Sequence, residues 1–145
     1  MQSVENAAAR LVTGAKRSDH ISPVLRQLHW LPVQQRVVSK IATLVYRSLS
    51  GHALGYVADD CQLVTDARAR LLRSVDTRTL TVHQTFSCFG DRSFAAAATR
   101  VWNSLPADLR KVELSYSRFR RSLKTFVWTV RPRRIVNFPF FNCSV

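Results

Sequence analysis

Apolar residues recur every three or four positions along much of the chain, which is the spacing of one face of a helix. The longest such run, 33–49, places Val33, Val37, Ile41 and Leu44 on one face before Gly51, so it predicts a helix that buries this face. Residues that commonly begin or end helices predict four further helices. One covers 2–13 and ends before Gly14, and one covers 22–29, with Ser22 as its N-cap and Pro23 as its first helical residue. A third is capped by Asp91 and runs to Trp102, and the last is opened by Ser115.

Two of these predicted helices also carry a line of basic side chains. In the last helix the residues Phe119, Leu123, Phe126, Val127 and Val130 share one face, and the other face holds Arg118, Arg120, Arg121 and Lys124. On the flank of the 33–49 helix, the basic residues at spacings i, i+4 and i+11 are Arg36, Lys40 and Arg47. These seven residues are the candidate phosphate contacts, although a solvated helix face, taken alone, is the better account of the second set.

The helical period is lost between residues 51 and 93, where Thr, Val and Phe are frequent. Thr79 to His83 and Thr85 to Phe89 are predicted as a small antiparallel pair. Residues 131–145 show no period and are expected to form an unstructured tail. The pattern therefore predicts a mainly α fold: one small domain, residues 1–130, of about five helices with a short β-hairpin or extended insertion in the middle.

The charge balance points to a polyanionic partner. Among 145 residues, 22 are basic and mostly arginine, 9 are acidic, and the net charge is +13. The planar guanidinium group suits phosphate oxygens, so contact with RNA or DNA is favoured over basic charge that serves solubility alone.

Catalytic and metal sites are not indicated. The three cysteines and four histidines lack metal-ligand spacing, and no nucleophile, phosphate-loop or paired-carboxylate motif occurs, so we expect no enzyme activity, cofactor, metal or small-molecule substrate. The run from Tyr56 to Asp60 superficially resembles the aromatic-x-Asp-Asp turn of polymerases, but Val57 stands where the aromatic residue belongs, so we read it as the acidic end of a short helix. No apolar run approaches the roughly 20 residues of a membrane span, and we expect a soluble, intracellular protein.

Five short motifs follow one another along the chain. They are Asn6 to Gly14; His29 to Val33 with Arg36; Gly90 to Phe94; Trp102 to Pro106 with Leu109 and Arg110; and Ser117, Phe119, Arg120, Leu123, Lys124 and Thr125. The ordered series resembles the segment that follows the polymerase domain in LINE-type (non-LTR) retrotransposon reverse transcriptases with an apurinic-type endonuclease. The resemblance covers about residues 2–128. Asp60, and the run Ala95 to Thr99 in place of an Ala-Ala-Pro step, depart from the family's pattern.

The resemblance implies a non-catalytic piece of an RNA-directed DNA polymerase, with the endonuclease, the palm aspartates and most of the thumb lying before Met1. Such a piece would hold template RNA or target DNA through its basic helix faces. Two alternatives stay open: a packing module whose partner is the missing thumb or palm, which predicts an exposed apolar patch on the first helix, and a decayed fragment without activity. Trp30 and Trp102 are interpreted as packing residues because apolar residues and proline flank them.

Overall fold

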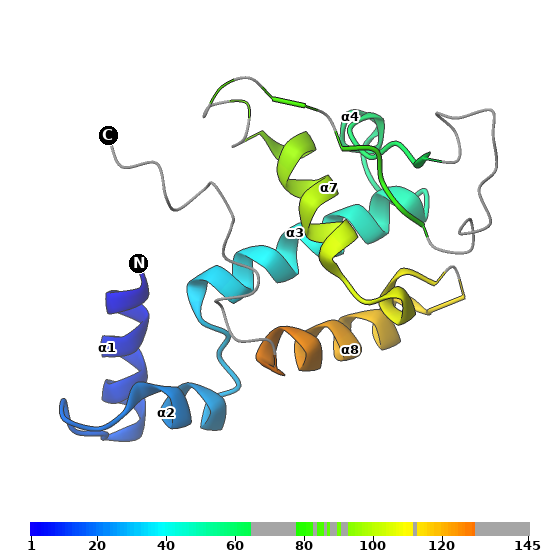
Figure 1. Cartoon of the computed structure of the whole chain (residues 1–145). Coiled ribbons are helices and arrows are strands. Elements are labelled where there is room, and N and C mark those ends of the chain that lie inside the picture. Colours follow the sequence, from blue (N-terminus) through cyan, green and yellow to red (C-terminus); the bar gives the residue numbers. More distant parts are fainter. Residues whose placement is uncertain are drawn as a thin grey trace. The chain divides into compact units, whose positions relative to one another are not determined.

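The computed structural model describes residues 1–64, 78–82, 84, 85, 87, 90, 93–111 and 113–129. Its elements are α1 (Gln2–Thr13), α2 (Ile21–Gln27), α3 (Val33–Leu49), α4 (Gly55–Asp59), α7 (Phe94–Ser104), the 3-10 helix η1 (Ala107–Arg110) and α8 (Tyr116–Thr129) (Figure 1). The mainly helical class is confirmed, and none of the described helices combines the length and apolar character needed to cross a bilayer. The chain forms two compact units, Met1–Val37 and Val38–Val145. The predicted tail, 131–145, lies outside the described residues.

In the first unit, the helix ends follow local sequence at one place and differ from it at another. Gly14 ends α1 with a left-handed φ of 69°, as predicted. By contrast, α2 begins at Ile21 after His20, so the prediction of Ser22 as its N-cap is wrong. Pro23 is tolerated as the third helical residue because the first N–H groups of a helix have no partner within the helix.

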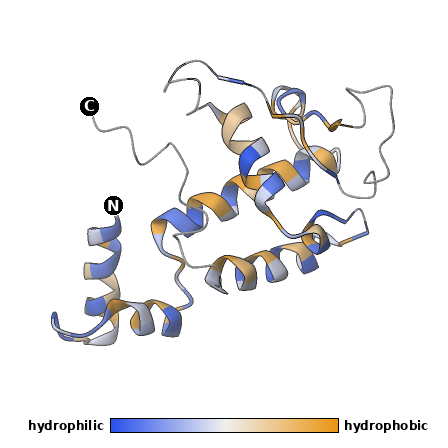
Figure 2. Cartoon of the chain, viewed as in Figure 1, coloured by the Kyte–Doolittle hydropathy of each residue, from blue (hydrophilic) through white to orange (hydrophobic). Residues whose placement is uncertain are grey.

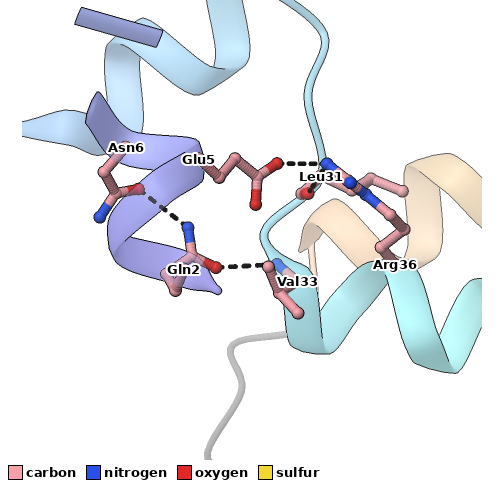
Figure 3. Close-up of polar contacts among 6 residues, drawn as sticks. All are labelled: Gln2, Glu5, Asn6, Leu31, Val33 and Arg36. Atoms are coloured by element: carbon pink, nitrogen blue, oxygen red, sulfur yellow. Dashed lines mark hydrogen bonds and ion pairs between the residues drawn. The ribbon is translucent and has the colours of Figure 1, made fainter. Parts of the chain in front are cut away.

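Polar side chains of α1 hold the start of α3 (Figure 3). The Gln2 side-chain oxygen accepts a hydrogen bond from the Val33 backbone N–H at 2.8 Å, which gives one of the unpaired N–H groups of α3 a partner. The Gln2 amide nitrogen donates to the side-chain oxygen of Asn6 at 2.8 Å and is held by it. Glu5 forms an ion pair with Arg36, and the Glu5 side chain is only 8% exposed. The polar side of α1 therefore faces the rest of the first unit.

The buried face of α3 differs from the predicted one. Its core residues are Val38, Ala42, Val45 and Tyr46, each at most 9% exposed, whereas Val37 and Leu44 are 39% and 42% exposed. The prediction that Val37 and Leu44 belong to the core is therefore wrong. Apolar residues occupy much of the circumference of α3, as the orange ribbon in Figure 2 shows, so periodicity alone did not define which side is covered.

Aromatic rings from three helices form the centre of the second unit. Tyr46 stacks on Phe119 with 4.3 Å between ring centroids and 19° between planes, and Trp102 lies 6.1 Å from Phe119. Trp102 and Phe119 are 1% and 0% exposed, which agrees with a packing role for Trp102. The Tyr46 hydroxyl donates to the Leu114 carbonyl, so the polar tip of this buried ring has a partner.

The start of α7 also differs from the prediction. The side chain of Ser93 accepts a hydrogen bond from the Ala96 N–H at 3.3 Å, so Ser93 is the N-cap and the helix begins at Phe94. The predicted cap, Asp91, lies outside the described residues. Ser115 precedes α8, and its hydroxyl accepts from the Arg118 N–H at 3.4 Å, as expected of an opening residue.

Two short segments in the middle of the chain pair with each other, which differs from the prediction. An isolated antiparallel bridge joins Leu63 to Leu80, with hydrogen bonds from the Val64 N–H to the Thr79 carbonyl and from the Thr81 N–H to the Gln62 carbonyl, both 2.9 Å. The predicted hairpin between 79–83 and 85–89 is not confirmed; residues 83, 86, 88 and 89 of that prediction lie outside the described part of the chain.

The motif Trp102 to Pro106 fixes this extended segment. The Asn103 side chain donates to the Leu80 carbonyl at 2.8 Å and accepts from the Leu80 N–H at 2.9 Å. The Trp102 indole N–H donates to the Arg78 carbonyl at 2.6 Å, and Arg110 donates to the Thr79 hydroxyl at 3.1 Å. The residues of this motif therefore serve the fold, because they anchor the segment 78–80 to α7 and η1.

Candidate nucleic-acid interface

The outer face of α8 is the most basic surface among the described elements. Phe119, Leu123 and Val127 are buried at four-residue spacing, which turns the positions between them outward. Those outward positions hold the exposed side chains of Arg118, Arg120, Arg121 and Lys124. The helix contains no Asp or Glu, and among the described residues no carboxylate forms an ion pair with these four. This face presents positive charge over about two helical turns.

A hollow of about 740 Å³ adjoins the first half of this face and has a mixed lining. Its apolar floor comes from Pro106, Leu109, Leu114 and Phe126, and its positive charges are Lys111, Arg118 and Arg121. Lys111 forms an ion pair with Asp108 at 2.7 Å, and this partner lowers the pKa of the Asp108 carboxyl. Because Lys111 is already paired with Asp108, Arg118 and Arg121 are the remaining positive charges of the hollow, and Glu113 adds one carboxylate to its lining.

The three basic residues predicted on α3 have different surroundings. Arg36 is paired with Glu5 and donates to the Leu31 carbonyl at 3.4 Å (Figure 3). A phosphate at Arg36 would compete with a largely buried carboxylate, and removing the pairing would leave that charge uncompensated. Lys40 is exposed, and Arg47 is exposed with one guanidinium nitrogen donating to the His52 carbonyl at 3.2 Å. Lys40 and Arg47 remain suited to phosphate contact.

Arg47 and the start of α8 lie at the same place in the second unit. A hollow of about 450 Å³ is lined by Tyr46, Arg47, Ser50, His52 and Tyr116. The guanidinium carbon of Arg120 lies 5.7 Å from the centroid of the Tyr116 ring. The fold thus places Arg47, from one candidate set of the sequence, beside Tyr116, the ring that Arg120 of the other set contacts.

A smaller hollow, of about 320 Å³, shares Arg47 and His52 with the hollow of about 450 Å³. Its other lining residues include Leu54 and Tyr56, and Tyr56 is 70% exposed. Neither Tyr116 nor Tyr56 is indicated as a contact residue by the sequence pattern described above. The spacing of four residues between Tyr116 and Arg120 is the one sequence signal for their contact, because residues i and i+4 are neighbours on a helix.

The side chains that ligate metals are spread out in the described residues. They contain no cluster of three or more His, Cys, Asp or Glu side chains able to hold a metal ion. The run that superficially resembles a polymerase turn forms the short helix α4, which ends at Asp59. Cys61 is buried, and burial raises the pKa of its thiol, with a smaller lowering by a hydrogen bond to Ser48. A thiol with a raised pKa is a poor nucleophile at neutral pH.

The chain matches no protein-family model, no curated protein and no solved structure.

Proposed function

We propose that this chain is a non-catalytic, nucleic-acid-binding segment of a LINE-type reverse transcriptase, which holds RNA or DNA through the outer face of α8. The observation that carries the proposal is the exposed set Arg118, Arg120, Arg121 and Lys124 on a helix without acidic residues. Arginine donors at i and i+3 along an exposed helix suit the oxygens of successive phosphates. Such contacts position a strand without reading its sequence.

The family assignment within this proposal is supported by the ordered motifs of the sequence. Their residues have distinct roles in the fold: Trp102 and Asn103 anchor the extended segment, while Arg120 and Lys124 lie on the exposed face. Solubility alone does not require the charges of α8 to gather on one face opposite buried Phe119.

A second candidate function, packing against the thumb or palm of the polymerase, is favoured by α1. Val4, Leu11 and Val12 are 71%, 85% and 66% exposed, while Gln2 and Glu5 point toward α3. A helix that turns its apolar side outward is typical of a surface that another protein segment covers. The two functions use different helices, so one protein is able to serve both.

Binding across a salt series tests the proposal. The purified chain is titrated against labelled single-stranded RNA and duplex DNA, with the variant Arg118→Gln/Arg121→Gln. The matched control is Lys16→Gln/Arg17→Gln, which also removes two positive charges from exposed positions. We expect affinity to fall steeply with salt, and the log–log slope for duplex DNA to shrink by about 1.8 in the α8 variant, since each phosphate contact contributes roughly 0.9.

The control variant is expected to keep the slope of the unmodified chain. Equal losses in both variants would mean that net charge, and not the α8 face, determines binding. Absence of binding at low salt would reject the nucleic-acid role and favour the packing function of α1 or a decayed fragment.

A further inference from the structure

The two hollows at the end of α3 join basic groups to exposed tyrosine rings. Arg47 and His52 line both of them. The first hollow, of about 450 Å³, also contains Tyr116, and the second hollow, of about 320 Å³, also contains Tyr56. Tyr116 is 42% exposed and Tyr56 is 70% exposed, although large aromatic side chains gain free energy from burial. No Asp or Glu lines either hollow in the described part of the chain. The surface therefore offers ring faces and cationic donors with no negative charge in its walls.

The walls of the first hollow are held by the fold before any ligand arrives. The His52 N–H donates to the Arg47 carbonyl at 2.9 Å, and the Arg47 guanidinium donates back to the His52 carbonyl at 3.2 Å. Gly51 makes this tight turn possible with a φ of 70°. Tyr116 lies 6.0 Å from the ring of Tyr46, which is anchored in the core. Little side-chain ordering is therefore required on binding, which favours affinity.

We propose that the first hollow binds an unpaired nucleotide of a single strand, with its base against the Tyr116 ring and its phosphate on Arg47. This inference rests on the proposed function and specifies the form of nucleic acid that the second unit prefers. A planar base has a face for Tyr116 only when it is unpaired and unstacked, so a duplex is not expected to use this site. The volume of about 450 Å³ falls within the roughly 300–1,000 Å³ typical of small-ligand pockets.

The positions of the cations agree with a backbone passing beside the ring. Arg47 lines the hollow beside Tyr116, while Arg120 holds the ring of Tyr116 by a cation–π contact, with its guanidinium carbon 5.7 Å from the ring centroid. Arg47 uses one guanidinium nitrogen on His52, and a guanidinium group has five N–H donors, so others are directed elsewhere. The second hollow continues from Arg47 and His52 to Tyr56, which gives the next nucleotide along the strand a path past a second ring.

Substitutions at one position test the stacking. Tyr116→Leu keeps an apolar side chain but removes the ring, and Tyr116→Phe keeps the ring and loses only the hydroxyl. Binding of the full chain is measured by fluorescence anisotropy with labelled U12 RNA, the dT12 strand and a 12-base-pair DNA duplex. We expect Tyr116→Leu to weaken binding of both single strands by roughly fivefold or more, the lower end of base stacking on an aromatic residue. Tyr116→Phe is expected to bind within about twofold of the unmodified chain.

Comparing duplex binding with single-strand binding separates this inference from the proposed function. Duplex binding, which depends on α8, is expected to be unchanged in Tyr116→Leu, and Arg47→Gln is expected to reduce the single-strand salt slope by about 0.7. If Tyr116→Leu binds single strands as the unmodified chain does, or loses duplex and single strands equally, the stacking site is rejected while the role of α8 stands. If the unmodified chain binds none of the three probes, both proposals fail.

Discussion

The side chain of Asn103 is predicted to be a major local determinant of stability. In the bridge between Leu63 and Leu80, the ladder hydrogen bonds are made by the neighbouring residues, so the N–H and C=O of Leu80 point away from the 62–64 segment. The Asn103 amide satisfies both groups, at 2.9 Å and 2.8 Å, and thereby acts as the next strand would. Because Leu80 is 1% exposed, water has little access to either group when the amide is removed.

The magnitude follows from these two hydrogen bonds. Asn103→Ala leaves one buried donor and one buried acceptor without a partner, and each costs about 1–3 kcal/mol, so with local relaxation we expect a loss of about 2–3 kcal/mol. For a chain of this size that corresponds to a fall in Tm of roughly 4–12 °C. Urea unfolding followed by circular dichroism measures the loss. Ser104→Ala, at an exposed neighbouring position, is the matched control and is expected to stay within about 0.5 kcal/mol.

Hydrogen exchange separates this local role from a general effect. The Leu80 amide should exchange faster in Asn103→Ala than in the unmodified chain, under conditions where both are folded. Asn103→Asp keeps the acceptor but sets a carboxylate against the Leu80 carbonyl, so its pKa should rise on folding. Its extra stability is then present below pH about 4 and is lost as pH rises through the folded pKa. An unchanged Leu80 exchange rate, or a loss within 0.5 kcal/mol for Asn103→Ala, would refute the reasoning.

Two further predictions concern buried polar groups of the second unit. Tyr46→Phe keeps the stacked ring but loses the hydroxyl that donates to a backbone carbonyl, so we expect a loss of about 1 kcal/mol in urea unfolding, against no measurable loss for the exposed Tyr56→Phe; equal effects would contradict the assignment of that hydrogen bond. The variant Cys88→Ser/Cys143→Ser keeps Cys61 as its single thiol. Since burial raises the pKa of Cys61, iodoacetamide at pH 8 should modify this variant more slowly than it modifies the free amino acid cysteine, and an equal rate would contradict the burial. The associated stability is fully present below the unfolded pKa of about 8.5 and is lost as pH rises through the raised folded pKa.

Much of the helical layout could be predicted because its signals are local. Gly14 and Gly51 end α1 and α3 at positive φ, and the bounds of α3 agree with its apolar run. The last helix was also predictable, including its buried Phe119 and its exposed basic face, because only one side of α8 is apolar. Where a helix has one apolar face, the hydrophobic effect leaves a single choice of orientation.

The candidate site could be predicted only in part. Its basic residues were evident from composition and spacing, but the pairing of Arg36 with Glu5 joins positions far apart in the sequence. The meeting of Arg47 with Tyr116 likewise depends on how α3 packs against α8 through Tyr46 and Phe119. No periodic pattern encodes which two surfaces meet.

The sequence by itself determined the mainly α class, the bounds of α1 and α3 and the basic outer face of α8, because glycines and side-chain period act within a few residues. The tertiary structure decided which face of α3 is buried, and it placed Val37 outside although Val38 is in the core. It also gave the N–H and C=O of Leu80, on the side away from Leu63, the Asn103 side chain as their partner. The physical reason is that α3 has apolar residues on more than one side, and that several partners would satisfy the hydrogen-bonding groups of Leu80. The buried face of α3 and the partner of Leu80 therefore depend on packing between distant parts of the chain.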